Sequence, residues 1–262
     1  MRRDVLELRA FYGSPLGRVA REMLARKVSE AWGDAAGLDV LGVGYPTPFL
    51  QYLDHRPRRV LAAMPGAQGV EVWPRNGRNR SVLVEEGDLP FRNAMFDRVL
   101  AVHALEESPD PLQLLCEIGR ITAPTGRVIV AVAARNGAWA NAEKTPFGHG
   151  RPFTRLQLES LLREAELEPT GYTRALYAPP MAAFARWAEG FEQAGARLWP
   201  GFAGIILMEA VKQTFAVKPR GARARAHVLV PGLQPSPVGM PPARTSGRRK
   251  QLSSDRLETP GV

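Results

Sequence analysis

The chain has 262 residues, of which 45% are hydrophobic, and its formal net charge is +9 at pH 7. This length and composition indicate a globular chain of one large domain or two small ones. No apolar run reaches the roughly 20 residues that span a bilayer, which excludes a transmembrane helix. The first residues, M-R-R-D-V-L-E-L-R-A-F-Y, contain no unbroken apolar segment, so we expect no signal peptide and a cytoplasmic protein.

The positive charge is concentrated at the C-terminal end. Residues 218–262 contain nine Lys or Arg and two acidic residues, whereas the preceding residues are almost balanced. This segment is rich in Pro, Gly, Ser and Arg, so we expect a disordered tail. We favour a solubilising tail because no aromatic residue is interleaved among the arginines. A salt-sensitive arm for RNA, DNA or an anionic membrane is the alternative.

Residues capable of thiol or metal chemistry are few and scattered. Cys116 is the single cysteine, and its place in the apolar helical pattern L-Q-L-L-C-E-I predicts buried packing without a nucleophilic role. The four histidines, at 55, 103, 149 and 227, have no partner at metal-ligand spacing. We therefore expect no structural zinc site and no bound metal.

The N-terminal half of the chain begins with helical patterns and continues with short apolar runs. Apolar residues recur at helical spacing over 4–32, and G-S-P at 13–15 interrupts them, which predicts two short helices. Thr47 is placed to cap a short helix that begins at Pro48. The apolar runs predict five strands, at 38–43, 58–64, 81–85, 97–103 and 126–133.

The later part of the chain predicts two more helices and two more strands. The helices are expected at 111–121 and 153–165, the second of them capped by Thr154, and the strands at 168–177 and 201–213. Strands that alternate with helical segments predict a parallel α/β sheet with crossover connections. We expect three parts: an N-terminal helical cap (1–34), an α/β domain (35–217) and the basic tail (218–262).

Two glycines one residue apart follow the first predicted strand, in L-D-V-L-G-V-G-Y-P. Ligands of doubly wound sheets lie beyond the carboxyl ends of the strands, and glycine lets backbone N–H groups approach a polar ligand. The turn at Gly42 and Gly44 is therefore a candidate site for a nucleotide-like ligand. A plain strand-to-helix turn is the alternative, because the third glycine of a dinucleotide site and the G-K-S or G-K-T of a phosphate loop are absent.

The order of the motifs around this turn is more specific. The turn is followed by E-E-G-D-L-P-F at 85–91, F-D-R-V-L-A-V-H-A-L-E at 96–106 and L-L-C-E-I-G-R-I-T-A-P-T-G-R-V-I-V at 114–130. This succession resembles class I S-adenosylmethionine-dependent methyltransferases, in particular the small-molecule type 11-like domain, over about residues 35–133. The stretch F-G-H-G-R-P-F at 147–153 resembles an alphaproteobacterial variety of this family whose members mostly have no assigned substrate. The resemblance implies a Rossmann-like, doubly wound, mostly parallel sheet with an antiparallel C-terminal strand, and S-adenosylmethionine as the cofactor.

The resemblance also implies roles for individual residues. Gly42 and Gly44, followed by Tyr45, match the loop that lies against the methionine part of the cofactor. Glu85, with Glu86 beside it, matches the acid that accepts a hydrogen bond from the adenine amino group. These residues form the cofactor site that we expect.

The sequence identifies catalytic residues less clearly than cofactor-binding ones. Methyl transfer depends mainly on aligning the acceptor with the methyl group and the sulfur and on excluding water, so it needs no fixed catalytic motif. A general base helps where the acceptor carries a proton of high pKa. His103 follows the fourth strand, where relatives present the methyl donor to the substrate, and His149 lies in G-H-G-R-P. Both are candidate bases, and a structural hydrogen bond is the alternative for His103. Tyr12 is placed to fold over the cofactor as a lid, as aromatics of relatives do.

Two positions depart from the family pattern. Val40 stands where the family has an acid, and Asp39, one position away, points to the other face of the strand. Met64 stands where the family has the acid that binds the ribose hydroxyls, so we expect it to contact the cofactor without that bond. A lost charged hydrogen bond weakens binding by about 10- to 100-fold.

We expect S-adenosylmethionine-dependent methyl transfer to an unidentified acceptor, with a small molecule favoured. The alternatives are a catalytically silent relative that serves as an interaction or regulatory module, and an RNA methyltransferase that uses the basic tail. No N-P-P-Y or D-P-P-Y stretch and no cysteine follows the fourth strand, which disfavours base methylation. Several aromatic residues either line a substrate pocket or, as we favour, belong to the core: Tyr177, Trp187, Phe191, Trp199 and Phe202.

Overall fold

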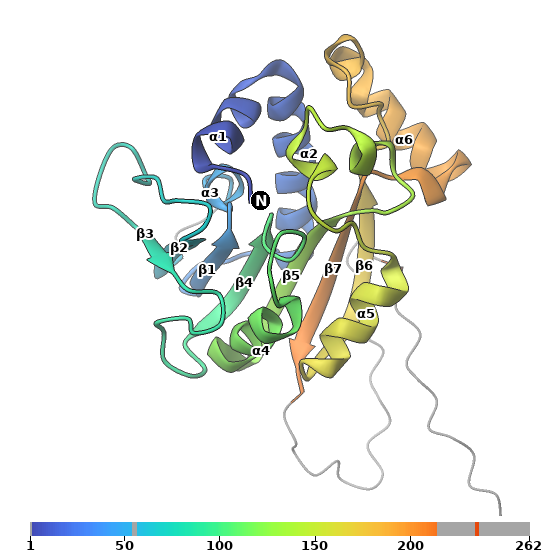
Figure 1. Ribbon diagram of the computed structural model, residues 1–262. Coiled ribbons are helices and arrows are strands. Elements are labelled where there is room, and N and C mark those ends of the chain that lie inside the picture. The colour runs from blue at the N-terminus through green and yellow to red at the C-terminus, as the bar shows by residue number, and fades with distance from the viewer. Residues whose placement is uncertain (1, 54–56, 214–233, 236–262) are drawn as a thin grey trace, which may run out of the picture.

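The computed structural model describes residues 2–53, 57–213 and 234–235, which form a mixed β-sheet with helices on both faces (Figure 1). The strands lie in the order β3-β2-β1-β4-β5-β7-β6-β8. The first five of these positions pair in parallel, whereas β7 runs antiparallel to both β5 and β6. The strands are β1 (Asp39–Gly44), β2 (Arg59–Pro65), β3 (Ser81–Val84), β4 (Phe96–Val102), β5 (Thr122–Ala133), β6 (Leu167–Ala175), β7 (Ile205–Lys212) and β8 (Gln234–Pro235).

This arrangement confirms the predicted doubly wound, mostly parallel sheet with an antiparallel C-terminal strand. The predicted tail at 218–262 lies outside the described residues, apart from the two residues of β8. No helix in the described part of the chain has the length and apolar character needed to cross a bilayer.

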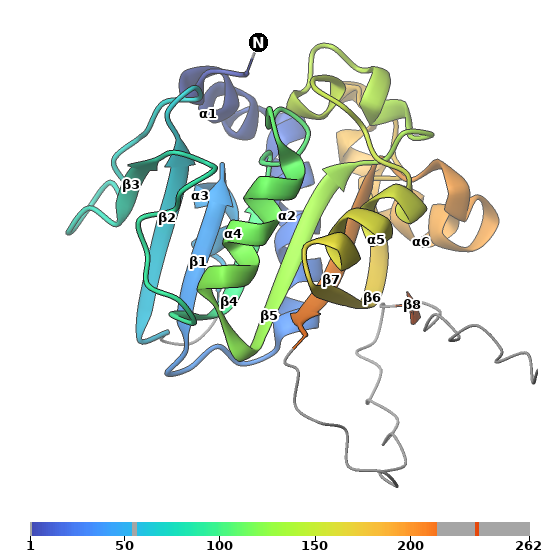
Figure 2. The ribbon, with the colours of Figure 1, turned by 60° about the horizontal axis from the view of Figure 1, so that its bottom comes forward.

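Helices cover both faces of the sheet, and the first helix of the chain crosses the carboxyl ends of the parallel strands (Figure 2). The helices are α1 (Val5–Gly13), α2 (Pro15–Trp32), α3 (Thr47–Leu50), α4 (Pro111–Ile121), α5 (Arg155–Glu164) and α6 (Ala188–Leu198). Consecutive residues of β4 point to opposite faces of the sheet. Leu100 belongs to the core cluster that includes α2, whereas Val99 belongs to the cluster that includes α4 and α5. Burial on both faces explains why the central strands are almost continuously apolar.

We predicted a break between the first two helices and the capping residues of two later helices, and the structure confirms the break and the cap of α5 but not that of α3. Ser14 separates α1 from α2 and accepts a hydrogen bond from Gly17 N at 3.0 Å, and Thr154 and Gln157 form a reciprocal capping box at the start of α5. The predicted cap at Thr47 is wrong, because α3 begins at Thr47 itself. Its hydroxyl instead donates to Glu71 at 2.7 Å.

The predicted burial of Cys116 is also wrong, because this residue lies on the solvent face of α4. Leu114, Leu115 and Ile118 occupy the core face of the same helix and leave Cys116 outside. Partial burial and nearby carboxylates raise the pKa of the Cys116 thiol, which keeps it protonated and weakly nucleophilic at neutral pH.

We predicted that five aromatic residues near the C-terminal end of the domain belong to the core, and this prediction is wrong for three of them. Trp187 and Phe202 are more than half exposed and Trp199 is exposed too, since they lie in or beside short 3₁₀ segments that flank α6 outside the sheet. Phe191 is partly buried against the core, and Tyr177 packs on Gly195, where an added Cβ would meet its side chain at 2.5 Å.

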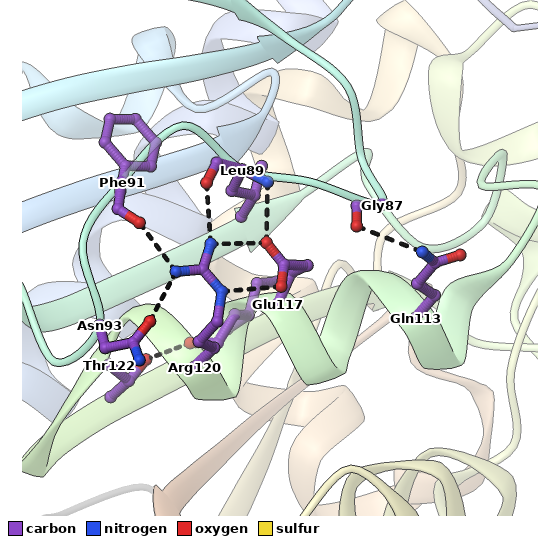
Figure 3. A network of polar contacts seen from close by, with 9 residues as sticks. Gly87, Leu89, Phe91, Asn93, Gln113, Glu117, Arg120 and Thr122 are labelled. Carbon is purple, nitrogen blue, oxygen red and sulfur yellow. Dashed lines mark hydrogen bonds and ion pairs between the residues drawn. The ribbon is translucent and has the colours of Figure 1, made fainter.

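The E-x-x-R part of the α4 motif has a structural role (Figure 3). The Arg120 guanidinium donates to the carbonyl oxygens of Leu89 and Phe91, each at 2.8 Å, and pairs with Glu117. Glu117 in turn accepts a hydrogen bond from Leu89 N at 2.8 Å. Together the two side chains fix the L-P-F stretch that follows β3.

We expect Arg120→Ala to lower the free energy of unfolding by about 2 kcal/mol, because two loop carbonyls and the Glu117 carboxylate lose a charged partner. Urea denaturation measures the change. Arg92→Ala in the same exposed loop is the matched control, and it should change stability by less than about 0.5 kcal/mol. Equal effects of the two variants would contradict the structural role.

Candidate functional site

The glycine turn after β1 is shaped by contacts within the chain itself. Gly44 has a φ of +90°, and a Cβ at this residue would lie 2.2 Å from the Val102 carbonyl oxygen. A Cβ at Gly42 would lie 2.2 Å from the side chain of Pro46. Tyr45 N donates to the Val102 carbonyl at 2.8 Å, so the turn fastens the carboxyl ends of β1 and β4 together.

A buried pair of Tyr12 and His103 lies beside this turn. His103, the first residue after β4, has a φ of +51°, and its Nε2 lies 2.6 Å from the Tyr12 hydroxyl. Burial and the nearby Arg2 lower the pKa of His103 to about 3, and burial raises the pKa of Tyr12. At neutral pH His103 is therefore neutral, and its tautomer decides which of the two groups donates the hydrogen bond. The Tyr45 ring stacks on Tyr12 with centroids 5.9 Å apart.

Residues 2–13, which we name the N-terminal cover, cross the carboxyl ends of the parallel strands (Figures 1 and 2). Arg2 forms an ion pair with Glu86 and donates to the carbonyl oxygens of His103 and Ala104 at 3.1 and 3.2 Å. Val5 N donates to the Gln68 carbonyl at 2.9 Å. The cover is therefore anchored to the segments that follow β2, β3 and β4.

Glu106 is a buried carboxylate that sequence reasoning missed. Its Oε1 accepts a hydrogen bond from Ala133 N at 2.9 Å, whereas its Oε2 has no partner among the described residues. Burial raises the pKa of Glu106 to about 7. Arg2 Nε is a second buried polar atom that finds no partner in the described part of the chain. The sequence shows that an acid stands in the segment after β4, but it does not show that this acid is buried.

The two acids after β3 lie in different environments. Glu85 is exposed, and its Oε1 faces Gly66 at the end of β2, 3.8 Å from the position of an added Cβ. Glu86 is half-buried, since it pairs with Arg2 and accepts from Ser108 Oγ at 3.1 Å. Met64 is fully buried in the core under the cover, together with Val40.

The G-H-G-R-P stretch folds towards the same strand ends. His149 Nε2 contacts the Arg3 guanidinium and lies 2.7 Å from the Glu143 carbonyl oxygen. Arg151 N donates to the Glu106 carbonyl at 2.8 Å. Phe147 packs against the His103 ring with centroids 4.6 Å apart. The structure thus joins His103 directly with Tyr12, which stacks on Tyr45, whereas Glu85 is exposed and His149 contacts Arg3.

Comparison with known proteins bears on this geometry. Residues 38–130 match the family described as methyltransferase domains. A possible histamine N-methyltransferase from Thermotoga maritima aligns with a TM-score of 0.60 and 19% identity, over 80% of this chain and 96% of that one. The chain has the class I methyltransferase fold.

Two other solved structures share this methyltransferase fold. A chain from the complex between the Trm112 methyltransferase activator of Haloferax volcanii and a candidate methyltransferase aligns with a TM-score of 0.59 and 20% identity, over 82% of this chain and 100% of that one. The [4+2]-cyclase SpnF aligns with a TM-score of 0.55 and 20% identity, over 76% of this chain and 82% of that one. Identities this low show the fold and not the reaction.

The match to methyltransferase domains supports S-adenosylmethionine as the cofactor. The groups at the strand ends fit a nucleoside with a zwitterionic tail: an exposed carboxylate at Glu85, a buried acceptor at Glu106 and a buried donor at Arg2. Val40 and Met64, which stand where the resemblance implies two further acids, lie in the core. Within residues 2–53, 57–213 and 234–235 we find no cluster of three or more His, Cys, Asp or Glu able to hold a metal ion.

Proposed function

We propose that the protein transfers a methyl group from S-adenosylmethionine to a small-molecule acceptor. The proposal is carried by two buried polar atoms that have no hydrogen-bond partner among the described residues, Arg2 Nε in the N-terminal cover and Glu106 Oε2 after β4. A buried polar group without a hydrogen bond costs about 1–3 kcal/mol. A ligand with both a donor and an acceptor would remove this cost for both atoms.

The cofactor would be held between the glycine turn and the acids after β3. In this proposal Glu85 accepts from the adenine amino group, and the turn at Gly42, Gly44 and Tyr45 positions the methionine part. Arg2 would leave Glu86 when the cofactor enters, because it bonds the carbonyl oxygens at the end of β4 where a ligand would lie. The cover, including Tyr12, would then close over the ligand as a lid. When bound, S-adenosylmethionine supplies a methyl group that is already activated by its sulfonium.

Glu106 is a better general base than His103 for this reaction. A base works best with a pKa near the operating pH, and the pKa of Glu106 is about 7 whereas that of His103 is about 3. His103 is also engaged with Tyr12, so its proposed role is to orient that ring. His149, which contacts Arg3, is proposed to hold the cover in place.

A catalytically silent relative is the second candidate function. Two observations favour it: Met64 is fully buried where the family has an acid, and Arg2 already neutralises Glu86. One of the similar structures, the [4+2]-cyclase SpnF, has the same fold but is named for a cyclisation and not for methyl transfer. The RNA methyltransferase alternative depends on the tail, most of which lies outside the described residues.

Calorimetric titration with S-adenosylmethionine and with its demethylated product tests the proposal. We expect binding by the full chain, and Glu85→Ala should weaken it roughly tenfold through loss of a hydrogen bond to the carboxylate. Asp88→Ala is the matched control, since Asp88 is an exposed acid in the same segment, and it should leave the affinity unchanged. Absence of heat with both compounds would support the silent relative instead.

A further inference from the structure

A separate cavity lies between α1, α3 and the loop that joins β2 to β3. Its volume is about 700 Å³, which is within the usual range for small-molecule sites. Figure 1 shows this loop at the edge of the sheet, on the side away from β5. The cavity shares Tyr12 and Tyr45 with the strand-end site, but Gly44, Glu85 and His103 do not line it.

The charge around this cavity is strongly positive. Its lining contains four arginines, Arg9, Arg21, Arg75 and Arg80, against the single acid Glu71. Arg9, Arg75 and Arg80 form no ion pair with any residue that the structure describes. Arg21 pairs with Glu22 at 3.9 Å, whereas its Nε is a buried donor without a described partner. Glu71 forms no ion pair with them among the described residues, because its carboxylate accepts hydrogen bonds from Thr47 Oγ1 at 2.7 Å and from Tyr45, and its one negative charge offsets only one of the four positive charges.

The loop that carries two of these arginines is ordered by its own hydrogen bonds. Arg80 N donates to the Trp73 carbonyl at 2.6 Å, and Trp73 N donates to Asn79 Oδ1 at 3.2 Å. These bonds hold Arg75 and Arg80 at the cavity before any ligand arrives, which lowers the entropic cost of binding. The opposite wall is apolar and is formed by Pro48, Leu50, Leu53, Pro57 and Val60.

We propose that this cavity binds a small organic phosphate with an apolar body. Guanidinium groups match the geometry of phosphate oxygens and bind them through paired charged hydrogen bonds. The prolines, leucines and valine of the opposite wall take the apolar part of the ligand out of water. This function goes beyond methyl transfer. Tyr12 and Tyr45 line both sites, but the residues argued to bind adenine and to act as base lie elsewhere, so a titration without cofactor tests this site on its own.

Calorimetric titration of the full chain without cofactor tests the proposal. The probes are octyl phosphate below its micelle concentration, inorganic phosphate, and the neutral amphiphile octyl glucoside. We expect octyl phosphate to bind at least tenfold more tightly than either of the others, because only it offers both the charge and the apolar body. Equal affinity for octyl phosphate and inorganic phosphate, or no binding of octyl phosphate, would overturn the proposal.

Three arginine variants locate the site. Arg75→Ala and Arg80→Ala should each weaken octyl phosphate binding about fivefold or more, since each removes a charged donor. Arg78→Ala is the matched control, because Arg78 is exposed in the same loop and does not line the cavity. Weakening by Arg78→Ala to the same degree would show general attraction to positive charge and would also overturn the proposal.

Discussion

Replacing Gly44 with valine is expected to lower the free energy of unfolding by roughly 3–6 kcal/mol, from a strained backbone and a steric clash. A branched side chain is strained at a φ of +90°, and its Cβ would lie 2.2 Å from the Val102 carbonyl oxygen. That carbonyl accepts the hydrogen bond of Tyr45 N, so it is not free to move aside. Urea denaturation followed by circular dichroism measures the loss.

Gly190→Val in α6 is the matched control, because a Cβ there meets no described residue within 4 Å and the backbone has no positive φ. Its stability should stay within about 0.5 kcal/mol of the unmodified chain. A Gly44→Val variant as stable as this control would contradict the close approach. The variant is also unsuitable as a probe of cofactor binding, since loss of binding would report loss of the fold.

The stability of variants at His103 and Glu106 is expected to depend on pH with opposite signs. The pKa of His103 is lowered from 6.5 to about 3, so the unfolded chain binds a proton there that the folded chain does not. This residue makes stability rise with pH between about 3 and 6.5. The pKa of Glu106 is raised from 4.5 to about 7, so here the folded chain keeps the proton and stability falls between about 4.5 and 7.

The two effects oppose each other between pH 4.5 and 6.5, and each amounts to about 2 kcal/mol over this window. Glu106→Gln leaves only the His103 effect, so from pH 4.5 to pH 6.5 the free energy of unfolding of this variant should rise by about 2 kcal/mol more than that of the unmodified chain. His103→Asn leaves only the Glu106 effect and should fall by a similar amount; asparagine tolerates the φ of +51°. Urea denaturation at both pH values measures the slopes. Parallel slopes in the two variants would contradict the buried, shifted states of these groups.

The elements of the fold could be predicted from sequence because each is encoded locally. The break at Ser14 follows from its G-S-P context, and the start of α5 follows from Thr154 and Gln157. The strands could be predicted because burial on both faces leaves them almost uniformly apolar. The solvent-facing position of Cys116 was missed because an apolar helical pattern does not fix which residue lies at the edge of the buried face.

The site was only partly predictable because it is assembled by contacts between distant segments. The bonds from Arg2 to Glu86 and from Tyr12 to His103 join residues about a third of the chain apart, and no local pattern encodes them. Glycine at 42 and 44 was predicted to admit a ligand. The structure supplies a different reason, since Pro46 and the Val102 carbonyl fill those places. The raised pKa of Glu106 depends on burial, which only the folded structure reveals.

A crystal structure of the full chain grown with S-adenosylhomocysteine, the demethylated product, tests the central claim most directly. We expect density for the nucleoside between Gly44 and Glu85, with the Arg2 ion pair to Glu86 broken and the N-terminal cover displaced or reclosed over the ligand. An Arg2–Glu86 pair that stays intact, with no ligand density beside Gly44 at saturating concentration, would contradict it.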